Sequence, residues 1–180
     1  EKDNILANLL IKKFSNNILM INKDVLKINE NILYDKSLIV FGNLPYNIST
    51  EILIKWILNL DQNKVWFSYL VLMFQKEVAD RITSKFNSSK YGRLSILANW
   101  KFEIKKIIDV KPNSFLPKPK IDSSILSLSP KKKFFKFKNS ENLELITRTF
   151  FNQRRKMIKK PFNKLFKGKI DILKKLNITS

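Results

Sequence analysis

The run Trp66–Phe74 constrains the fold of this chain more than any other segment. It reads Trp-Phe-Ser-Tyr-Leu-Val-Leu-Met-Phe, so almost every side chain is apolar. A strand that is apolar on both faces has to be covered on both faces, as in the sheets of α/β proteins. We therefore expect a buried central strand here, and a helix that follows it from about Gln75 to Thr83.

Strands and helices alternate along the chain before this run. Hydrophobic periodicity predicts strands over Asn17–Asn22 and Leu38–Phe41, and helices over Ile5–Phe14 and Ser49–Leu60. The second helix has Ser49 or Thr50 as its N-cap and an apolar face made of Ile52, Leu53, Trp56 and Ile57. After a Pro-rich loop at Phe115–Lys120, a last strand is expected over Ile121–Leu128. This alternation favours an α/β fold with a parallel sheet.

The character of the sequence changes near Pro130. The next eight residues, Lys131–Lys138, read Lys-Lys-Lys-Phe-Phe-Lys-Phe-Lys and predict a linker or an exposed basic edge. A main helix is expected over Glu141–Lys160. We therefore expect two domains: a sheet domain at 1–129 and a small basic helical domain at 130–180.

Net charge and residue composition exclude some kinds of site and favour a polyanionic partner. The net charge is +20, and 16 basic but only 3 acidic residues lie between Lys131 and Ser180, which indicates a polyanionic partner for that part. Cysteine and histidine are both absent, so disulfides and the commonest metal ligands are excluded, and no metal is expected. There is no apolar run long enough for a membrane span and no secretory signal at the first residues, so we expect a cytoplasmic protein, with monomer as the default.

The segment Asn43-Leu44-Pro45-Tyr46 follows the predicted strand Leu38–Phe41 directly, at the end where open α/β sheets place their chemistry. The Asn43 side-chain oxygen and a backbone carbonyl near Pro45 would accept hydrogen bonds from both N–H groups of an exocyclic amine. Tyr46 would stack on the ring that carries this amine. The segment thus predicts a neutral clamp for a planar, amine-bearing base. A simple proline turn after a strand is the alternative.

Five segments, in order, resemble signatures of one family, the ribosomal RNA adenine N6,N6-dimethyltransferases, which modify two adjacent adenosines near the 3′ end of small-subunit RNA. They are Phe41–Ser49, Gln75–Arg81, Tyr91–Ser95, Phe115–Ser123 and Phe151–Lys156. The resemblance spans nearly the whole chain. It implies a Rossmann-like methyltransferase sheet that uses S-adenosylmethionine, with a small all-α domain after it.

The resemblance also implies roles for individual residues. Asn43, Leu44, Pro45 and Tyr46, with Phe115, would form the catalytic site. Glu1 would bind the ribose of S-adenosylmethionine, Asp24 would accept from its adenine amine, and Asn43 would lie between cofactor and target base.

The glycines indicate that the start of the fold is missing. A donor of this type is normally held by a Gly-rich turn after the first strand. The only glycines here are Gly42, Gly92 and Gly168, and none lies in such a turn. By resemblance the first strand and the Gly-rich loop should lie before Glu1, and a last helix or two should follow Ser180, so we expect a fragment of a longer protein.

The basic cluster at Phe151–Lys156 predicts an RNA contact, because two consecutive arginines in a chain with five suit bidentate phosphate binding. A solvated helix face is the alternative. The RNA-binding residues expected from the cluster and its flanks are Arg148, Asn152, Gln153, Arg154, Arg155, Lys156, Lys159 and Lys160.

There are three alternative functions, of which two stay open. The missing cysteine favours methylation of an amine over methylation of a pyrimidine ring carbon. Large-subunit RNA adenine methyltransferases that confer macrolide resistance share the Asn-Leu-Pro-Tyr type of motif, whereas DNA adenine methyltransferases more often carry a version that Leu44 contradicts. A non-catalytic RNA-binding assembly factor is the third alternative.

Overall fold

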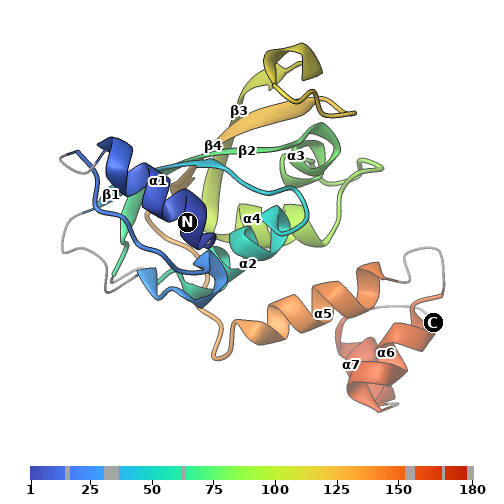
Figure 1. Ribbon diagram of the computed structural model, residues 1–180. Helices are drawn as coiled ribbons and strands as arrows, with labels where there is room; N and C mark the ends of the chain where they lie inside the picture. The colour runs from blue at the N-terminus through green and yellow to red at the C-terminus, as the bar shows by residue number, and fades with distance from the viewer. Residues whose placement is uncertain (15–16, 31–36, 62–63, 153–156, 168, 178–180) are drawn as a thin grey trace.

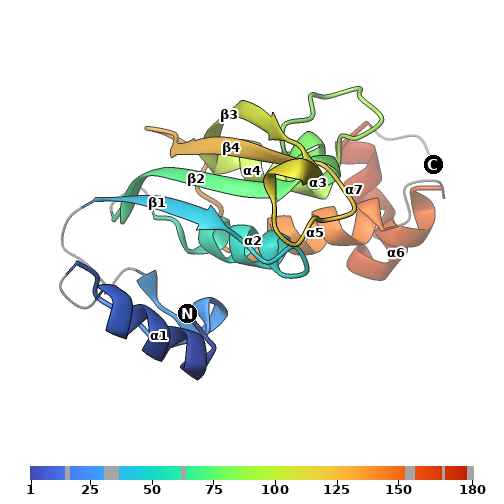
Figure 2. The same ribbon diagram turned by 45° about the horizontal axis from the view of Figure 1, so that its top comes forward.

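The computed structural model describes residues 1–14, 17–30, 37–61, 64–152, 157–167 and 169–177. Within these residues four strands form one mixed sheet in the order β1-β2-β4-β3 (Figures 1 and 2). The strands are β1 (Leu38–Asn43), β2 (Phe67–Gln75), β3 (Phe102–Val110) and β4 (Ser123–Pro130). β1 pairs parallel with β2, and β4 pairs antiparallel with both β2 and β3. Three of the strands were predicted, but the parallel arrangement holds only for β1 and β2.

Two features of the sheet differ from the sequence analysis. β3 was not predicted, because it is an edge strand in which five of nine residues are exposed and four are charged. The predicted strand at Asn17–Asn22 is wrong, since the structure has no strand there. The reason is that the segment has no neighbouring strand to pair with: the Ile21 carbonyl accepts instead from the amino group of Glu1, at 3.1 Å.

The described residues also form helices on the sheet and beyond it. The helices are α1 (Asn4–Phe14), α2 (Ser49–Asn59), α3 (Lys76–Ile82), α4 (Arg93–Lys101), α5 (Glu141–Phe151), α6 (Lys159–Phe166) and α7 (Ile170–Lys175). Short 3-10 turns lie at η1 (Val25–Lys27) and η3 (Pro112–Ser114). The predicted helices that became α1, α2 and α3 are confirmed, while α4 was missed.

Two helix boundaries correct the sequence analysis. Neither Ser49 nor Thr50 is the N-cap of α2: Ile48 takes that position, and the Ser49 hydroxyl donates to the Tyr46 carbonyl at 3.2 Å. The helix expected over Glu141–Lys160 ends at Phe151, and α6 begins at Lys159. Pro161 explains a new start there, because its missing N–H is harmless in the first turn of a helix but disruptive further along.

The core lies between one face of the sheet and helices α2, α3 and α4. On β2 the alternate residues Leu70, Leu72 and Phe74 are fully buried against these helices. The same side chains contact the apolar face of α2, and Leu126 and Leu128 of β4 complete the layer. Figure 1 shows α5, α6 and α7 beyond α4, away from the sheet. An ion pair between Arg93 on α4 and Glu144 on α5 joins the two parts.

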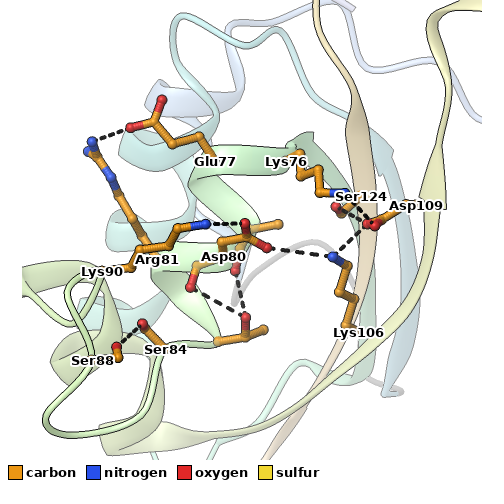
Figure 3. A network of polar contacts seen from close by, with 12 residues as sticks. Lys76, Glu77, Asp80, Arg81, Ser84, Ser88, Lys90, Lys106, Asp109 and Ser124 are labelled. Atoms are coloured by element: carbon orange, nitrogen blue, oxygen red, sulfur yellow. Dashed lines mark hydrogen bonds and ion pairs between the residues drawn. The ribbon is translucent and has the colours of Figure 1, made fainter.

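A polar network ties α3 to β3 and β4 (Figure 3). The Asp109 carboxylate on β3 accepts from Lys76 at 2.8 Å, from Lys106 at 2.6 Å and from the Ser124 hydroxyl at 2.6 Å. Lys106 also lies 3.5 Å from Asp80 on α3, which in turn pairs with Lys90 at 2.6 Å. The bonds from Lys106, Lys76 and Ser124 hold the pKa of Asp109 far below its ordinary value.

We expect the substitution Asp109→Asn to destabilise the fold at neutral pH and to have less effect in acid. A carboxyl whose pKa is lowered by folding adds stability above its unfolded pKa, about 3.9, and loses it as the pH falls through and below that value. Urea unfolding of both proteins at pH 7 and pH 3 measures this. An equal difference in unfolding free energy at the two pH values would contradict the assignment.

Lys101, the last residue of α4, is buried with 3% of its surface exposed. Its ammonium group donates to the Leu60 carbonyl at 2.8 Å and lies 4.3 Å from the centre of the Trp100 ring. Burial lowers the pKa of Lys101 to about 8, and Asp61 opposes this shift. Nothing in the sequence pattern marked this lysine, because its burial follows from how α2 and α4 pack.

The variant Lys101→Met tests this burial. Between about pH 8 and pH 10.5 the unfolded chain holds a proton at Lys101 that the folded chain has released, so the unfolding free energy rises with pH. The full effect of such a shift is about 3 kcal/mol. We expect the stability of the parent chain relative to Lys101→Met to rise by about 2–3 kcal/mol between pH 7.5 and pH 10.5. Chemical denaturation of both proteins at both pH values measures this. A constant difference in unfolding free energy between them would refute the lowered pKa of Lys101.

Candidate active site

The segment Asn43–Tyr46 lies at the carboxyl end of β1, as the sequence predicted. Asn43 is the last residue of the strand and is exposed, opposite Met73 of β2. There is no room for a larger residue before it, because a Cβ atom at Gly42 would lie 2.8 Å from Leu72 Cδ2 and 3.0 Å from Leu44 Cδ2. This close packing against buried Leu72 sets the direction in which the chain leaves the sheet.

The backbone beyond the strand turns tightly into α2. The Pro45 carbonyl accepts from the Ile48 amide at 3.1 Å, and the Tyr46 carbonyl accepts from the Ser49 hydroxyl. Among the hydrogen bonds of the described residues, none uses the Leu44 carbonyl. The turn therefore leaves the Leu44 oxygen, with the Asn43 side chain, as acceptors next to Tyr46.

Tyr46 is fixed by a residue that the sequence analysis did not single out. Its hydroxyl lies 2.6 Å from the hydroxyl of Ser123, the first residue of β4. Ser123 is fully buried and stands opposite Gln75 of β2 in the antiparallel ladder. Only the position of Ser123 at the end of a conspicuous Pro-rich segment gave a signal.

Phe115 joins the same site. An open hollow of 340 Å³ is lined by Asn43, Leu44, Pro45, Tyr46, Phe115, Pro117 and Pro119. Figure 2 shows the loop between β3 and β4 bending toward the carboxyl end of β1, which brings these distant segments together. The five residues expected to be catalytic thus share one surface, with aromatic rings and neutral acceptors on it.

The two acids expected to bind the cofactor lie near each other at the start of the chain. The Asn22 side chain donates to the Glu1 carbonyl at 3.0 Å, and Lys2 lies 3.8 Å from Asp24. The Glu1 carboxylate accepts from the amides of Lys2 and Asp3, and the bond from Asp3 lowers the pKa of Glu1. Among the described residues, no hydrogen bond or ion pair of either acid reaches a residue that lines the 340 Å³ hollow.

Asp24 also has a structural role, because its carboxylate accepts from the Leu26 amide and caps η1. The turn after it is anchored on α2 by Lys55, which donates to the Val25 carbonyl at 2.7 Å and pairs with buried Glu30 at 2.6 Å. Trp56 of α2 donates to the same Glu30 carboxylate at 2.6 Å. One helix therefore holds both the Asp24 turn and the segment after β1.

Of the residues expected to bind RNA, the structure describes four. Arg148 and Asn152 lie at the end of α5, and Lys159 and Lys160 form the first turn of α6; all four are exposed. Gln153, Arg154, Arg155 and Lys156 lie outside the described residues.

A second cavity, of 530 Å³, brings three of the family-like segments together. It lies where α2, α3, the start of α4 and the end of α5 meet, and its cations and amide come from Arg81, Lys90, Arg93 and Asn152. The Tyr91 and Phe151 rings, 6.5 Å apart, also line it. Thr50 lines the cavity four residues after Tyr46, so α2 begins between this cavity and the 340 Å³ hollow.

The described residues show neither a metal-binding cluster nor a membrane-spanning helix. In the described part of the chain no three Asp, Glu, His or Cys side chains group closely enough to hold a metal ion. Nor does any described helix have the length and apolar character to cross a membrane.

Comparison with known proteins identifies the family of this chain. The profile of the ribosomal RNA adenine dimethylase family matches residues 1–180. The chain belongs to this family. It is 61% identical over 178 residues to a ribosomal RNA small subunit methyltransferase A of Pelagibacter ubique, covering 99% of this chain and 68% of that protein.

More distant relatives carry the same name. A Wolbachia protein, also named ribosomal RNA small subunit methyltransferase A, is 42% identical over 163 residues, or 88% of this chain and 58% of its own length. A Zymomonas mobilis relative of that name is 41% identical over 146 residues, or 81% and 52%. The chain therefore spans between about half and two thirds of the length of these relatives.

Solved structures support the fold. A dimethyladenosine transferase from Plasmodium falciparum is 26% identical and superposes with a TM-score of 0.74, over 100% of this chain and 66% of that one. The 23S rRNA methyltransferase ErmE is 24% identical with a TM-score of 0.61, over 83% and 57%. The expected Rossmann-like methyltransferase fold is thereby confirmed.

The bond between Tyr46 and Ser123 leads to a stability prediction. Tyr46→Phe leaves the buried Ser123 hydroxyl without this partner, and we expect a loss of about 1–2 kcal/mol of unfolding free energy. Ser123→Ala should cost about 1 kcal/mol, and the double variant less than the sum of the two losses, because both remove the same interaction. Urea unfolding of the four proteins measures the coupling. Simple additivity would show that the bond contributes nothing.

Proposed function

We propose that this chain is the catalytic part of an S-adenosylmethionine-dependent enzyme that dimethylates two adjacent adenosines near the 3′ end of small-subunit ribosomal RNA. The observation that carries the proposal is the 340 Å³ hollow, in which Asn43–Tyr46 and Phe115 meet at the carboxyl end of β1. The names of the matched relatives support the small subunit as the substrate.

The hollow suits an extruded adenine. The base has to leave its stack to reach the site, and the rings of Tyr46 and Phe115 would hold it by its faces. The bond to Ser123 sets the plane of the Tyr46 ring before the base arrives. A stacking surface that is already oriented reduces the entropy lost on binding.

The acceptors suit the exocyclic amine. The Asn43 side-chain oxygen and the Leu44 carbonyl would each accept a hydrogen bond from one N–H of the amine. The nitrogen lone pair would then point toward the methyl group. The Pro45 and Tyr46 carbonyls are engaged by Ile48 and Ser49, which makes Leu44 the available backbone acceptor. The amine is neutral, so these residues act by orientation and by excluding water, and no general base is needed before attack.

The residues present fit the methyl donor in chemistry. S-adenosylmethionine supplies an electrophilic methyl group on a sulfonium. Glu1 would accept from its ribose hydroxyls, Asp24 from its adenine amine, and Asn43 would face both donor and target. The support is that Asp24 is partly exposed and held by its turn on α2, and that Glu1 is tied to the same region through Asn22 and Lys2.

RNA binding is proposed for the 530 Å³ cavity and the helices beyond it. Arg81 and Arg93 keep N–H groups for phosphates beside their pairing with Glu77 and Glu144. Arg148, Asn152, Lys159 and Lys160 extend this surface. Gln153, Arg154, Arg155 and Lys156 are proposed to bind RNA as well. The proposal divides the chain at residue 130 and makes the basic helices a small RNA-binding domain. It also includes a monomeric protein that works in the cytoplasm.

The test is methyl transfer from labelled S-adenosylmethionine to small ribosomal subunits from cells that lack the modification, followed by chromatography of the nucleosides. The chain is compared with a form extended upstream of Glu1. Dimethyladenosine in small-subunit RNA supports the proposal. Product in large-subunit RNA instead would favour the macrolide-resistance activity, and RNA binding without any product would favour the assembly factor.

In the form that is active, we expect Asn43→Ala to lower the transfer rate at saturating substrate by about 100-fold, because the amine loses its orientation. Asn43 is exposed, so its replacement should leave thermal stability almost unchanged. Asn47, also exposed and four residues later, is the matched control, and Asn47→Ala should retain activity. Equal rates for the two variants would exclude Asn43 from the chemistry.

A further inference from the structure

The segment Lys131–Lys138 is not a free linker between the sheet and α5. The Lys131 amide donates to the Lys101 carbonyl at 2.8 Å, and the indole of Trp100 donates to the Phe135 carbonyl at 2.7 Å. The Phe137 ring lies 5.2 Å from Trp100 and 4.8 Å from Phe135. Both ends of the segment are thus attached to the end of α4.

This attachment leaves cations and two aromatic rings, Phe135 and Phe137, exposed. Lys132, Lys133, Lys136 and Lys138 are exposed, and among the ion pairs of the described residues none involves them. The Phe135 side chain is 70% exposed even though its backbone is held. A ring fixed in that position has a free face for stacking.

The surface beside the segment is hollowed. A depression of 490 Å³ is lined by Lys131, Lys132 and Lys133 together with Tyr69, Glu103 and Ser129. Three cations face one carboxylate there, so the local charge is positive. Tyr69 is itself half exposed and adds a second aromatic side chain.

The segment lies at the opposite end of the sheet from the hollow at Tyr46. β4 begins at Ser123, which bonds to Tyr46, and ends at Pro130, directly before Lys131. A strand rises about 3.3 Å per residue, so this strand separates the two surfaces by roughly 25 Å. Whatever binds there does not compete for the hollow.

We propose that Lys131–Lys138 is a second RNA-binding surface, in which the lysines contact phosphates and Phe135 stacks on an unpaired base. The proposal rests on the proposed function in one respect, that the substrate is a large RNA. Unpaired lysines around a fixed, exposed ring are the pattern by which single-stranded RNA is held without sequence reading. RNA that lies about 25 Å from the target adenosines would be bound there, so a hairpin too short to span this distance would not reach the surface.

The variant Lys132→Gln/Lys133→Gln tests the lysines. Its matched control is Lys12→Gln/Lys13→Gln, because these are also consecutive exposed lysines, on α1, and the charge change is the same. Binding is measured against salt with two RNAs: the whole small-subunit RNA, and a short hairpin that carries the two adenosines.

We expect the first variant to bind the whole RNA about tenfold more weakly at low salt, and its dependence of log affinity on log salt to flatten by about 1.4 for two phosphates of a single strand. Hairpin binding should change no more than in the control. If the two variants bind the whole RNA alike, the surface is not an RNA contact. Equal weakening for both RNAs by the first variant would also overturn the proposal, because it would indicate a general charge effect.

Phe135 gives a second test that does not depend on charge. Phe135→Ala should weaken binding of the whole RNA about tenfold, and Phe135→Trp should restore it, since a larger ring stacks at least as well. No rescue by tryptophan would refute stacking. Failure of the proposed function is recognised separately, because it means no methyl transfer to either RNA by the unsubstituted protein, whatever the binding.

Discussion

The position of β2 between β1 and β4 is the constraint on which the rest of the structure depends. β2 is the apolar strand, and it pairs parallel with β1 but antiparallel with β4. The end of β1, the end of β2 and the start of β4 therefore meet at one edge of the sheet, with Asn43 opposite Met73 and Ser123 opposite Gln75. A slip of one residue would turn Leu70, Leu72 and Phe74 out of the core, so the burial of these side chains holds the site in register.

Helix α2 connects the end of β1 to the turn after Asp24. Its apolar face packs in the core, its start follows Tyr46, and its Lys55 and Trp56 hold the turn after Asp24 through Glu30. A buried carboxylate needs such partners, because an unpaired buried charge is costly. The helix thus relates the proposed clamp for the target base to the proposed cofactor-binding region, although the two are about twenty residues apart in sequence.

The sequence analysis worked where a pattern is local. The strands at Leu38 and Phe67 follow from continuous apolar runs, and the helix at Ser49 follows from apolar residues at period 3.6. It failed where pairing partners decide the outcome. Asn17–Asn22 has strand composition but no neighbour to bond with, and β3 is a strand despite exposed lysines because β4 pairs with it along its length. The bond from Tyr46 to Ser123 joins residues 77 positions apart and has no local signature.

By itself the sequence determined the family and the order of the motifs, because residue types and their spacing carry that information directly. It also determined where the positive charge lies along the chain. Only the tertiary structure decided that Ser123 orients Tyr46, that Arg81, Arg93 and Asn152 share one cavity, and that Lys131–Lys138 is attached at the far end of β4. These facts depend on strand order and on helix packing, which bring together residues whose separation in sequence says nothing about their distance in space.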